Sequence, residues 1–162
     1  MSDADIVPIR IDSSGELAGL HQRCMLAADG WAEPGLKRLL QADAAHGFQA
    51  ELDRSVVGFV LAFAAADEAE VLAICVSPEL RSQGLGRKLL KALERSLAAR
   101  GTGRLHLEAR ASNLSARELY AKAGFVETGR RKGYYSGTEG LPQEDAILMA
   151  KVLSAAPTTE AF

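Results

Sequence analysis

The stretch from Val71 to Arg87 constrains the fold of this chain more than any other part of it. It begins with an unbroken apolar run up to Val76, which is typical of a buried strand. Pro78 ends this strand because proline has no N–H group to give to a neighbouring strand. A turn with two glycines follows, and leucine then recurs every four residues from Leu85, which predicts an amphipathic helix. The sequence therefore predicts a strand that leads through a glycine-containing turn into the N-terminus of a helix.

This predicted strand–turn–helix unit is suited to binding a phosphate group. The N–H groups in the first turn of a helix have no partners inside the helix, and the helix dipole is positive there. Gly84 and Gly86 allow the backbone to approach an anion without an intervening Cβ. Positive charge around the turn comes from Arg81, Arg87 and Lys88. An ordinary polar turn is the alternative, because the glycine spacing fits neither a dinucleotide-binding fingerprint nor a P-loop.

Composition and charge argue against several classes of protein. Of the 162 residues, 48% are hydrophobic and 25% are charged, as in globular domains, and the net charge of -2 carries no signature of nucleic-acid or membrane binding. No apolar run reaches the roughly 20 residues that span a bilayer, and the acidic start at residues 1–5 is unlike a signal peptide. We therefore expect a cytoplasmic protein with one domain over residues 1–153 and a disordered tail over residues 154–162.

The two cysteines, Cys24 and Cys75, lie on separate predicted elements without the spacing of a disulfide or metal motif. We expect them to be reduced, buried thiols, as is usual in a reducing compartment. The three histidines are scattered singly, so no metal site is expected.

Residue periodicity predicts strands and helices throughout residues 6–153. The first strand is expected at 6–11, with Val7, Ile9 and Ile11 on one face. Further strands are expected at 48–52, 56–64, 70–76 and 104–109, from residue 125 onward, and at 146–153. Helices are expected at 16–28 after a cap by Ser13 or Ser14, from Trp31 with Pro34 in the first turn, at 84–99 and at 113–123. Three consecutive strands followed by a strand–helix–strand unit require a mixed sheet. The predicted fold class is α/β (α+β), with a mostly antiparallel, twisted sheet flanked by helices.

The strand at 104–110 alternates strictly between apolar and polar residues. One face carries Leu105, Leu107 and Ala109, so the opposite face carries His106, Glu108 and Arg110. A carboxylate near the end of a strand could deprotonate an ammonium group and so act as a general base. The alternative is that Glu108 forms a solvated ion pair with Arg110 on an exposed face.

Two motifs in the chain resemble the GNAT superfamily of N-acetyltransferases. The first is the Arg-x-x-Gly-x-Gly turn at 81–86, which in that family holds the pyrophosphate of acetyl-CoA. The second, Asn-x-x-Ala-x-x-Leu-Tyr-x-x-x-Gly-Phe at 113–125, is highly specific. The resemblance implies a GNAT-type fold, acetyl-CoA as co-substrate, Asn113 on the pantetheine arm, and Tyr120 as the catalytic acid that protonates the departing thiolate. It implies further cofactor contacts from Ile74, Cys75, Val76, Arg81, Ser82, Gln83, Gly84, Leu85, Gly86 and Arg87.

A narrower resemblance is to the ribosomal-protein alanine N-acetyltransferases of the RimI type. It is carried by residues 107–113, 130–135 and 144–149 together with the second motif. It implies that Glu108 is the general base and that the acceptor is the N-terminal alanine of a small-subunit ribosomal protein. Cys75 stands where that family has a small alanine, and His106 stands where it often has a large aromatic residue.

Four aromatic residues have two interpretations each. Tyr120 could simply pack with its hydroxyl at the surface, beside core positions at Leu119 and Ala123. Trp31, between the first two helices, could pack over the core or line a groove for the acceptor substrate. Tyr134 and Tyr135, expected between the last two strands, could form a wall that faces the acceptor peptide or could pack on the sheet.

The predicted function is direct transfer of an acetyl group to an amine, without a covalent enzyme intermediate. The backbone N–H of Val76 is the candidate donor to the thioester oxygen. The alternatives are an acetyltransferase for lysine side chains or small-molecule amines, and a non-catalytic acyl-CoA-binding module. The expected partners are acetyl-CoA and the N-terminal peptide of a ribosomal protein, with no direct contact to nucleic acid or membrane.

Overall fold

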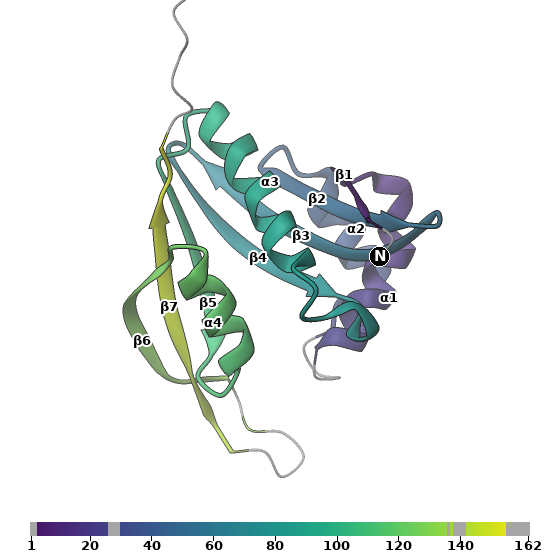
Figure 1. Ribbon diagram of the computed structural model, residues 1–162. Coiled ribbons are helices and arrows are strands. Elements are labelled where there is room, and N and C mark those ends of the chain that lie inside the picture. The colour runs from purple at the N-terminus through teal and green to yellow at the C-terminus, as the bar shows by residue number, and fades with distance from the viewer. Residues whose placement is uncertain (1–2, 26–29, 136, 138–141, 155–162) are drawn as a thin grey trace, which may run out of the picture. The chain divides into compact units, whose positions relative to one another are not determined.

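The computed structural model describes residues 3–25, 30–135, 137 and 142–154 (Figure 1). The strands in this part of the chain are β1 (Asp5–Pro8), β2 (Ala45–Leu52), β3 (Ser55–Ala65), β4 (Glu68–Val76), β5 (Arg104–Arg110), β6 (Val126–Tyr135) and β7 (Glu144–Val152). The helices are α1 (Ser14–Cys24), α2 (Glu33–Gln41), α3 (Leu85–Ala99) and α4 (Leu114–Lys122), with short 3₁₀ turns η1 (Ile11–Ser13) and η2 (Pro78–Leu80). Contacts group the chain into a first unit, Met1–Phe63 with Val71–Leu93, and a second unit, Ala64–Glu70 with Glu94–Phe162.

The strands pair in the order β1-β2-β3-β4-β5-β7-β6, which confirms the mixed, mostly antiparallel sheet. The β1–β2, β2–β3, β5–β7 and β6–β7 pairs are antiparallel. By contrast, β4 and β5 are parallel from Glu68↔Arg104 to Glu70↔His106. A parallel pair needs a crossover, and α3 supplies it, as the sequence predicts. No helix in the described part of the chain is both long and apolar enough to cross a membrane.

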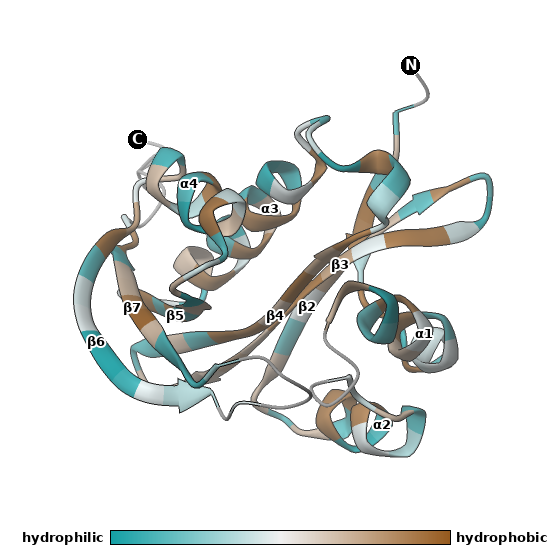
Figure 2. Cartoon of the chain, turned by 90° about the horizontal axis from the view of Figure 1, so that it is seen from below, coloured by the Kyte–Doolittle hydropathy of each residue, from teal (hydrophilic) through white to brown (hydrophobic). Residues whose placement is uncertain are grey.

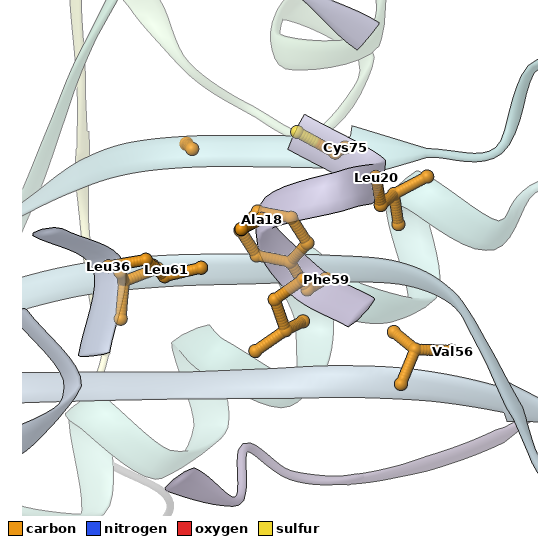
Figure 3. Packing of buried hydrophobic residues seen from close by; sticks show 9 residues of the cluster. Ala18, Leu20, Leu36, Val56, Phe59, Leu61 and Cys75 are labelled. Atoms are coloured by element: carbon orange, nitrogen blue, oxygen red, sulfur yellow. The ribbon is translucent and has the colours of Figure 1, made fainter. Parts of the chain in front are cut away.

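The core of the first unit is built on both faces of β3 and β4. Figure 2 shows hydrophobic residues along these strands, with α1 and α2 on one side and α3 on the other. Phe59 of β3 is fully buried in a cluster with Leu20 of α1 and Leu36 of α2 (Figure 3). Its neighbour Gly58 faces the opposite way, since a Cβ there would lie 3.2 Å from a methyl group of Leu89 in α3. Gly58 and Phe59, which follow each other in β3, therefore face helices on opposite sides of the strand.

The four-residue period predicted for α3 is confirmed. The leucines that it places on one side of the helix are all buried: Leu85, Leu89, Leu93 and Leu97. The helix is followed by Gly101, whose φ of 89° is typical of a glycine after a helix C-terminus.

In the second unit, β5 has the predicted alternation. Its buried residues are Leu105, Leu107 and Ala109, and its half-buried residues are His106, Glu108 and Arg110. β7 separates β5 from β6, and β6 is the last strand of the order, with mostly exposed residues. Figure 2 shows β6 as largely hydrophilic. The second unit therefore presents a polar face on β5 and β6.

The N-terminal strand is shorter than the sequence predicts. β1 ends at Pro8, and Ile11 lies in the 3₁₀ turn η1 with 46% of its surface exposed. Asp12 and the two serines after it form turns readily, because their short polar side chains compete with regular backbone pairing. This local preference overrides the alternation of isoleucine and valine that favours a longer strand.

The start of α1 also differs from the prediction. Ser13 stands at the N-cap position, but it makes no side-chain capping hydrogen bond. Its hydroxyl instead accepts from Gln49 Nε2 at 3.1 Å, and the Ser14 hydroxyl donates to Glu33 Oε1 at 3.2 Å. The described helix ends at Cys24. Residues 26–28 of the expected helix and residues 155–162 of the expected tail lie outside the described residues.

Gly47→Ala is expected to destabilise the protein by roughly 1–3 kcal/mol. A Cβ at this position in β2 would lie 2.5 Å from the Val60 carbonyl oxygen and 2.6 Å from Ile9 Cδ1, and a strand carbonyl cannot move aside. Gly19→Ala is the matched control, because Gly19 is exposed on α1 and its Cβ would meet no atom within 4 Å. Alanine there should stabilise the helix by up to about 1 kcal/mol. Urea denaturation of both variants measures the difference, and equal stabilities would contradict the described packing.

Candidate active site

The turn between β4 and α3 has the backbone geometry of an anion-binding loop. Ser82 and Gly84 have positive φ angles of 63° and 83°, and α3 begins at the buried Leu85. A Cβ at Gly84 would meet no atom within 4 Å, so this side of the turn is open. The turn can therefore offer the first N–H groups of α3 to a phosphate. In the turn, Gly86 is half-buried and the exposed residues are Arg81, Ser82, Gln83, Gly84 and Arg87.

At the end of β4, the Val76 carbonyl oxygen accepts two side-chain donors. Arg81 Nε lies 3.3 Å from it, and the Cys24 thiol donates to it at 3.4 Å. Ile74 and Val76 are half-buried, whereas Cys75 is 2% exposed. The expectation of a buried thiol is therefore confirmed for Cys75 but wrong for Cys24, which is half-buried at the end of α1. Arg81 therefore holds the end of the strand in addition to adding charge to the turn.

In the second unit, Glu108 pairs with an arginine that the sequence did not single out. The carboxylate Oε1 lies 3.4 Å from Arg131 Nε, and 18% of the Glu108 side chain is exposed. The expected alternative partner, Arg110, instead lies 3.4 Å from Glu144 Oε2. The pairing of Glu108 with Arg110 was therefore wrong, although the face on which Glu108 lies was predicted correctly.

The sheet register explains how Arg131 reaches Glu108. Glu108 lies opposite Leu148 of β7, and Leu148 lies opposite Gly129 of β6, so these three residues share one face. Arg131 is two residues beyond Gly129 and therefore on the same face. Because Gly129 has no side chain, the place across from Glu108 is open to the long side chain of Arg131. A residue with a Cβ at that position would come within 3.3 Å of Leu148.

Glu144 forms a second charged contact on β7. It accepts a hydrogen bond from the backbone N–H of Ser112, just after β5, and it pairs with Arg110. The hydrogen bonds from Ser112, together with the Arg110 guanidinium, hold the pKa of the Glu144 carboxyl below its usual range. No spacing along the chain marks Glu144 or Arg131, because each meets its partner through cross-strand register.

Asn113 and Tyr120, the two residues of the second motif with implied roles, lie at the start of α4 and within it. Asn113 caps the helix, with its Oδ1 accepting from the Ala116 N–H at 3.2 Å, which leaves the side-chain amide as the donor that a ligand could use. Tyr120 is 5% exposed, and its ring lies edge-on to Phe125 with centroids 6.0 Å apart. The sequence predicted Leu119 and Ala123 as the core positions of this helix. That was wrong, because both are half-buried and Tyr120 is the buried residue.

The two tyrosines expected between the last strands lie within β6 itself. Their rings contact each other edge-on, with centroids 5.1 Å apart. The Arg110 guanidinium lies 4.1 Å from the centre of the Tyr135 ring, and the Arg131 guanidinium lies 5.0 Å from that of Tyr134. Tyr134 is exposed and Tyr135 is half-buried. The polar face of β5, β7 and β6 thus combines the carboxylates of Glu108 and Glu144 with two arginines and two aromatic rings.

Trp31 has a well-defined structural partner in the first unit. Its ring stacks on His21 with centroids 4.1 Å apart, and its backbone N–H donates to His21 Nδ1 at 3.0 Å. It packs against the core cluster and remains half-buried. Within the described residues, no group of three or more His, Cys, Asp or Glu side chains is placed to hold a metal ion.

Comparison with known proteins gives the family. The model of the Acetyltransferase (GNAT) family matches residues 15–125. The chain is 42% identical over 107 residues to the [ribosomal protein bS18]-alanine N-acetyltransferase of Escherichia coli K12, covering 66% of this chain and 71% of that protein. It is 38% identical over 99 residues to the protein of the same name from Haemophilus ducreyi, covering 61% and 68% respectively.

Solved structures agree with these sequence similarities. The crystal structure of the ribosomal-protein-S18-alanine N-acetyltransferase from Escherichia coli matches with a TM-score of 0.85 and 33% identity, over 98% of this chain and 99% of that one. Ard1 from Thermoplasma volcanium has the same fold, with a TM-score of 0.81 at 21% identity over 94% of this chain and 99% of its own. The chain therefore belongs to the GNAT acetyltransferase family and is an acetyl-CoA-dependent N-acetyltransferase.

Proposed function

We propose that this enzyme transfers the acetyl group of acetyl-CoA to the N-terminal α-amine of a ribosomal protein that begins with alanine. The observation that carries the proposal is the 42% identity to an enzyme named for alanine acetylation of ribosomal protein bS18. The sequence also retains the carboxylate and the tyrosine that the proposed chemistry requires, Glu108 and Tyr120. Such an acceptor implies that the enzyme works in the cytoplasm.

The proposed mechanism assigns proton transfers to two side chains. An α-ammonium group is not a nucleophile, so Glu108, directly or through a water, takes a proton from it. The free amine attacks the thioester carbonyl, and the backbone N–H of Val76 is the candidate donor to the oxygen that becomes negative. Tyr120 then protonates the departing CoA thiolate. The position of Glu108 supports this role, because it lies on the polar face of β5 with 18% of its side chain exposed.

The proposal divides the binding of the two substrates between separate groups of residues. The pyrophosphate of acetyl-CoA is assigned to the turn at 81–87, and the pantetheine arm to the backbone of Ile74–Val76 and to Asn113. The acceptor peptide is assigned to Trp31, Tyr134 and Tyr135. The open turn and the exposed ring of Tyr134 support these assignments.

The pKa of the acceptor favours an α-amine over a lysine. A peptide α-amine has a pKa of about 7.7–8.0, whereas a lysine side chain has one of about 10.4. Near neutral pH the α-amine is already partly neutral, so one carboxylate base suffices. A lysine would require strong desolvation or a second base.

We expect a peptide that begins with alanine and contains a lysine to be acetylated at its α-amine. The same peptide with a blocked N-terminus should not be acetylated. Peptides beginning with serine, methionine or glycine should react less well, with discrimination of about 1–3 kcal/mol for small changes of side chain. Mass spectrometry locates the acetyl group. Acetylation of the lysine side chain in the free-amine peptide would overturn the proposal in favour of a lysine acetyltransferase.

Tyr135→Ala is expected to raise KM for the acceptor peptide more than it lowers kcat. The substitution removes the ring that faces the Arg110 guanidinium and is assigned to the peptide-facing wall. Tyr135→Phe is the matched control, because it keeps the ring and should keep KM close to the wild-type value. Steady-state kinetics with varied peptide separates the two parameters, and an unchanged KM in Tyr135→Ala would remove Tyr135 from the peptide site.

A further inference from the structure

The two cysteines of this chain lie together in the first unit. Cys24 ends α1 and is half-buried, whereas Cys75 lies in β4 and is 2% exposed. Cys24 packs against the same hydrophobic cluster that contains Cys75, and Figure 3 shows Cys75 close to Leu20 of α1. The Cys24 thiol donates to the carbonyl of Val76, the residue that follows Cys75, at 3.4 Å.

The charges around this thiol pair favour ionisation of Cys24. The hydrogen bond from Cys75, and the nearby guanidinium groups of Arg81 and Arg23, lower the pKa of the Cys24 thiol to about 6. The hydrogen bond with Cys24 and burial both raise the pKa of Cys75. The same two arginines also lie near the carboxylate of Glu79. The pKa of Glu79 is lowered mainly by the hydrogen bond that its carboxylate accepts from the Ser77 hydroxyl, and to a lesser extent by the two arginines. The half-buried Cys24 is therefore the more easily ionised thiol of the two, and the buried Cys75 is the less easily ionised one.

We propose that Cys24 and Cys75 form an oxidation site for hydroperoxides, in which Cys24 is the reacting thiol and Cys75 resolves it to a disulfide. This site is independent of the acceptor substrate and of the roles proposed for Glu108 and Tyr120. Cys24 is half-buried and its thiol contacts the Val76 carbonyl at the end of β4. Cys75 lies one residue before Val76, in the hydrophobic cluster against which Cys24 packs.

The reaction balances with hydrogen peroxide as the oxidant. The Cys24 thiolate attacks one peroxide oxygen, the O–O bond breaks, and hydroxide leaves and takes up a proton to become water. Cys24 is then a sulfenic acid. The Cys75 sulfur attacks the Cys24 sulfur, the S–O bond breaks, and a second water leaves with the Cys75 proton. Two thiols are oxidised to one disulfide, and one peroxide is reduced to two waters. Where Cys24 is protonated, the disulfide would also remove the hydrogen bond that its thiol donates to the Val76 carbonyl.

Intact-protein mass spectrometry after treatment with hydrogen peroxide tests the proposal. We expect the full chain to lose two hydrogens, to lose both free thiols together, and to yield a peptide in which Cys24 is linked to Cys75. Dithiothreitol should reverse the change, which distinguishes it from oxidation of the three methionines. Persistence of both thiols, or a dimer linked between two chains, would overturn the proposal.

Two variants separate the roles of the thiols. In Cys75→Ala the reaction should stop at a Cys24 sulfenic acid, which dimedone captures. In Cys24→Ser the rate of thiol loss should fall by at least about tenfold, because the buried, protonated Cys75 thiol reacts slowly with peroxide that arrives from solvent. Equal rates in Cys24→Ser and the wild type would overturn the assignment of Cys24.

The pH dependence of the wild type gives a readout that does not require either variant to fold. Alkylation of Cys24 by iodoacetamide should be half-maximal near pH 6, well below the pH of about 8.5 expected for an ordinary cysteine. A midpoint near the ordinary value would contradict the assignment of Cys24 as the reacting thiol.

Discussion

Glu108→Gln is expected to lower turnover of an alanine-starting peptide by roughly 10²- to 10⁴-fold near neutral pH, the usual contribution of a general base. Glutamine preserves the size of the side chain but cannot accept the ammonium proton. The uncatalysed fraction of neutral α-amine remains available, so activity should rise with pH in the variant more steeply than in the wild type. Release of CoA at saturating acetyl-CoA measures turnover across pH.

Two measurements isolate the chemical role of Glu108 from a structural one. The Arg131 side chain is 53% exposed, so losing its ion pair with Glu108 should lower the free energy of unfolding by at most about 1 kcal/mol. Urea denaturation of Glu108→Gln measures this loss. Glu118→Gln makes the same chemical change on the exposed side of α4, where Glu118 pairs with Lys122, and it should leave turnover unchanged. Wild-type turnover in Glu108→Gln would place the base elsewhere. His106, whose Nε2 lies 3.4 Å from Glu68 Oε1, would be the next candidate.

The Arg131 contact affects how Glu108 can act in the proposed mechanism. An arginine beside the carboxylate fixes the direction of the Glu108 side chain, with Nε 3.4 Å from Oε1. The same guanidinium lies near the Tyr134 ring, so Arg131 is held between a carboxylate and an aromatic face. An incoming ammonium group must share the carboxylate with Arg131 or displace it. Because 53% of the Arg131 side chain is exposed, displacement toward solvent requires little rearrangement of the sheet.

Features that depend on neighbours along the chain were predictable from the sequence. The strand β4, the turn after it and α3 form one continuous stretch, so periodicity and turn chemistry were enough to identify them. The alternation of β5 placed Glu108 on the correct face for the same reason. The family motifs identified the family, which periodicity alone could not give.

Features that depend on register across the sheet were not predictable. Arg131 reaches Glu108 only because β5, β7 and β6 align Glu108, Leu148 and Gly129, and β6 shifts register between Glu127 and Gly129. A shift of one residue would turn Arg131 to the other face. The error at Tyr120 has a related cause. α4 has nine residues, and so short a helix does not fix its buried side by periodicity alone.

Gly84→Val is expected to weaken acetyl-CoA binding by about 10- to 100-fold, equivalent to about 1.4–2.8 kcal/mol. The side chain would occupy the open side of the turn, where the pyrophosphate is assigned, and would keep the anion from the N–H groups of α3. Valine also disfavours the φ of 83° at this position, so the variant should lose roughly 1–2 kcal/mol of stability. Calorimetric titration with acetyl-CoA measures the affinity.

Gly101→Val separates the loss of the anion site from the loss of stability. Gly101 has a similar φ of 89°, follows the other end of α3, and likewise has no atom within 4 Å of a built Cβ. The backbone strain should therefore be comparable, so both variants should unfold at similarly reduced urea concentrations. Only Gly84→Val should lose affinity for acetyl-CoA, because no phosphate is assigned to the turn at Gly101. Equal affinities in the two folded variants would remove the turn at 81–87 from the acetyl-CoA site.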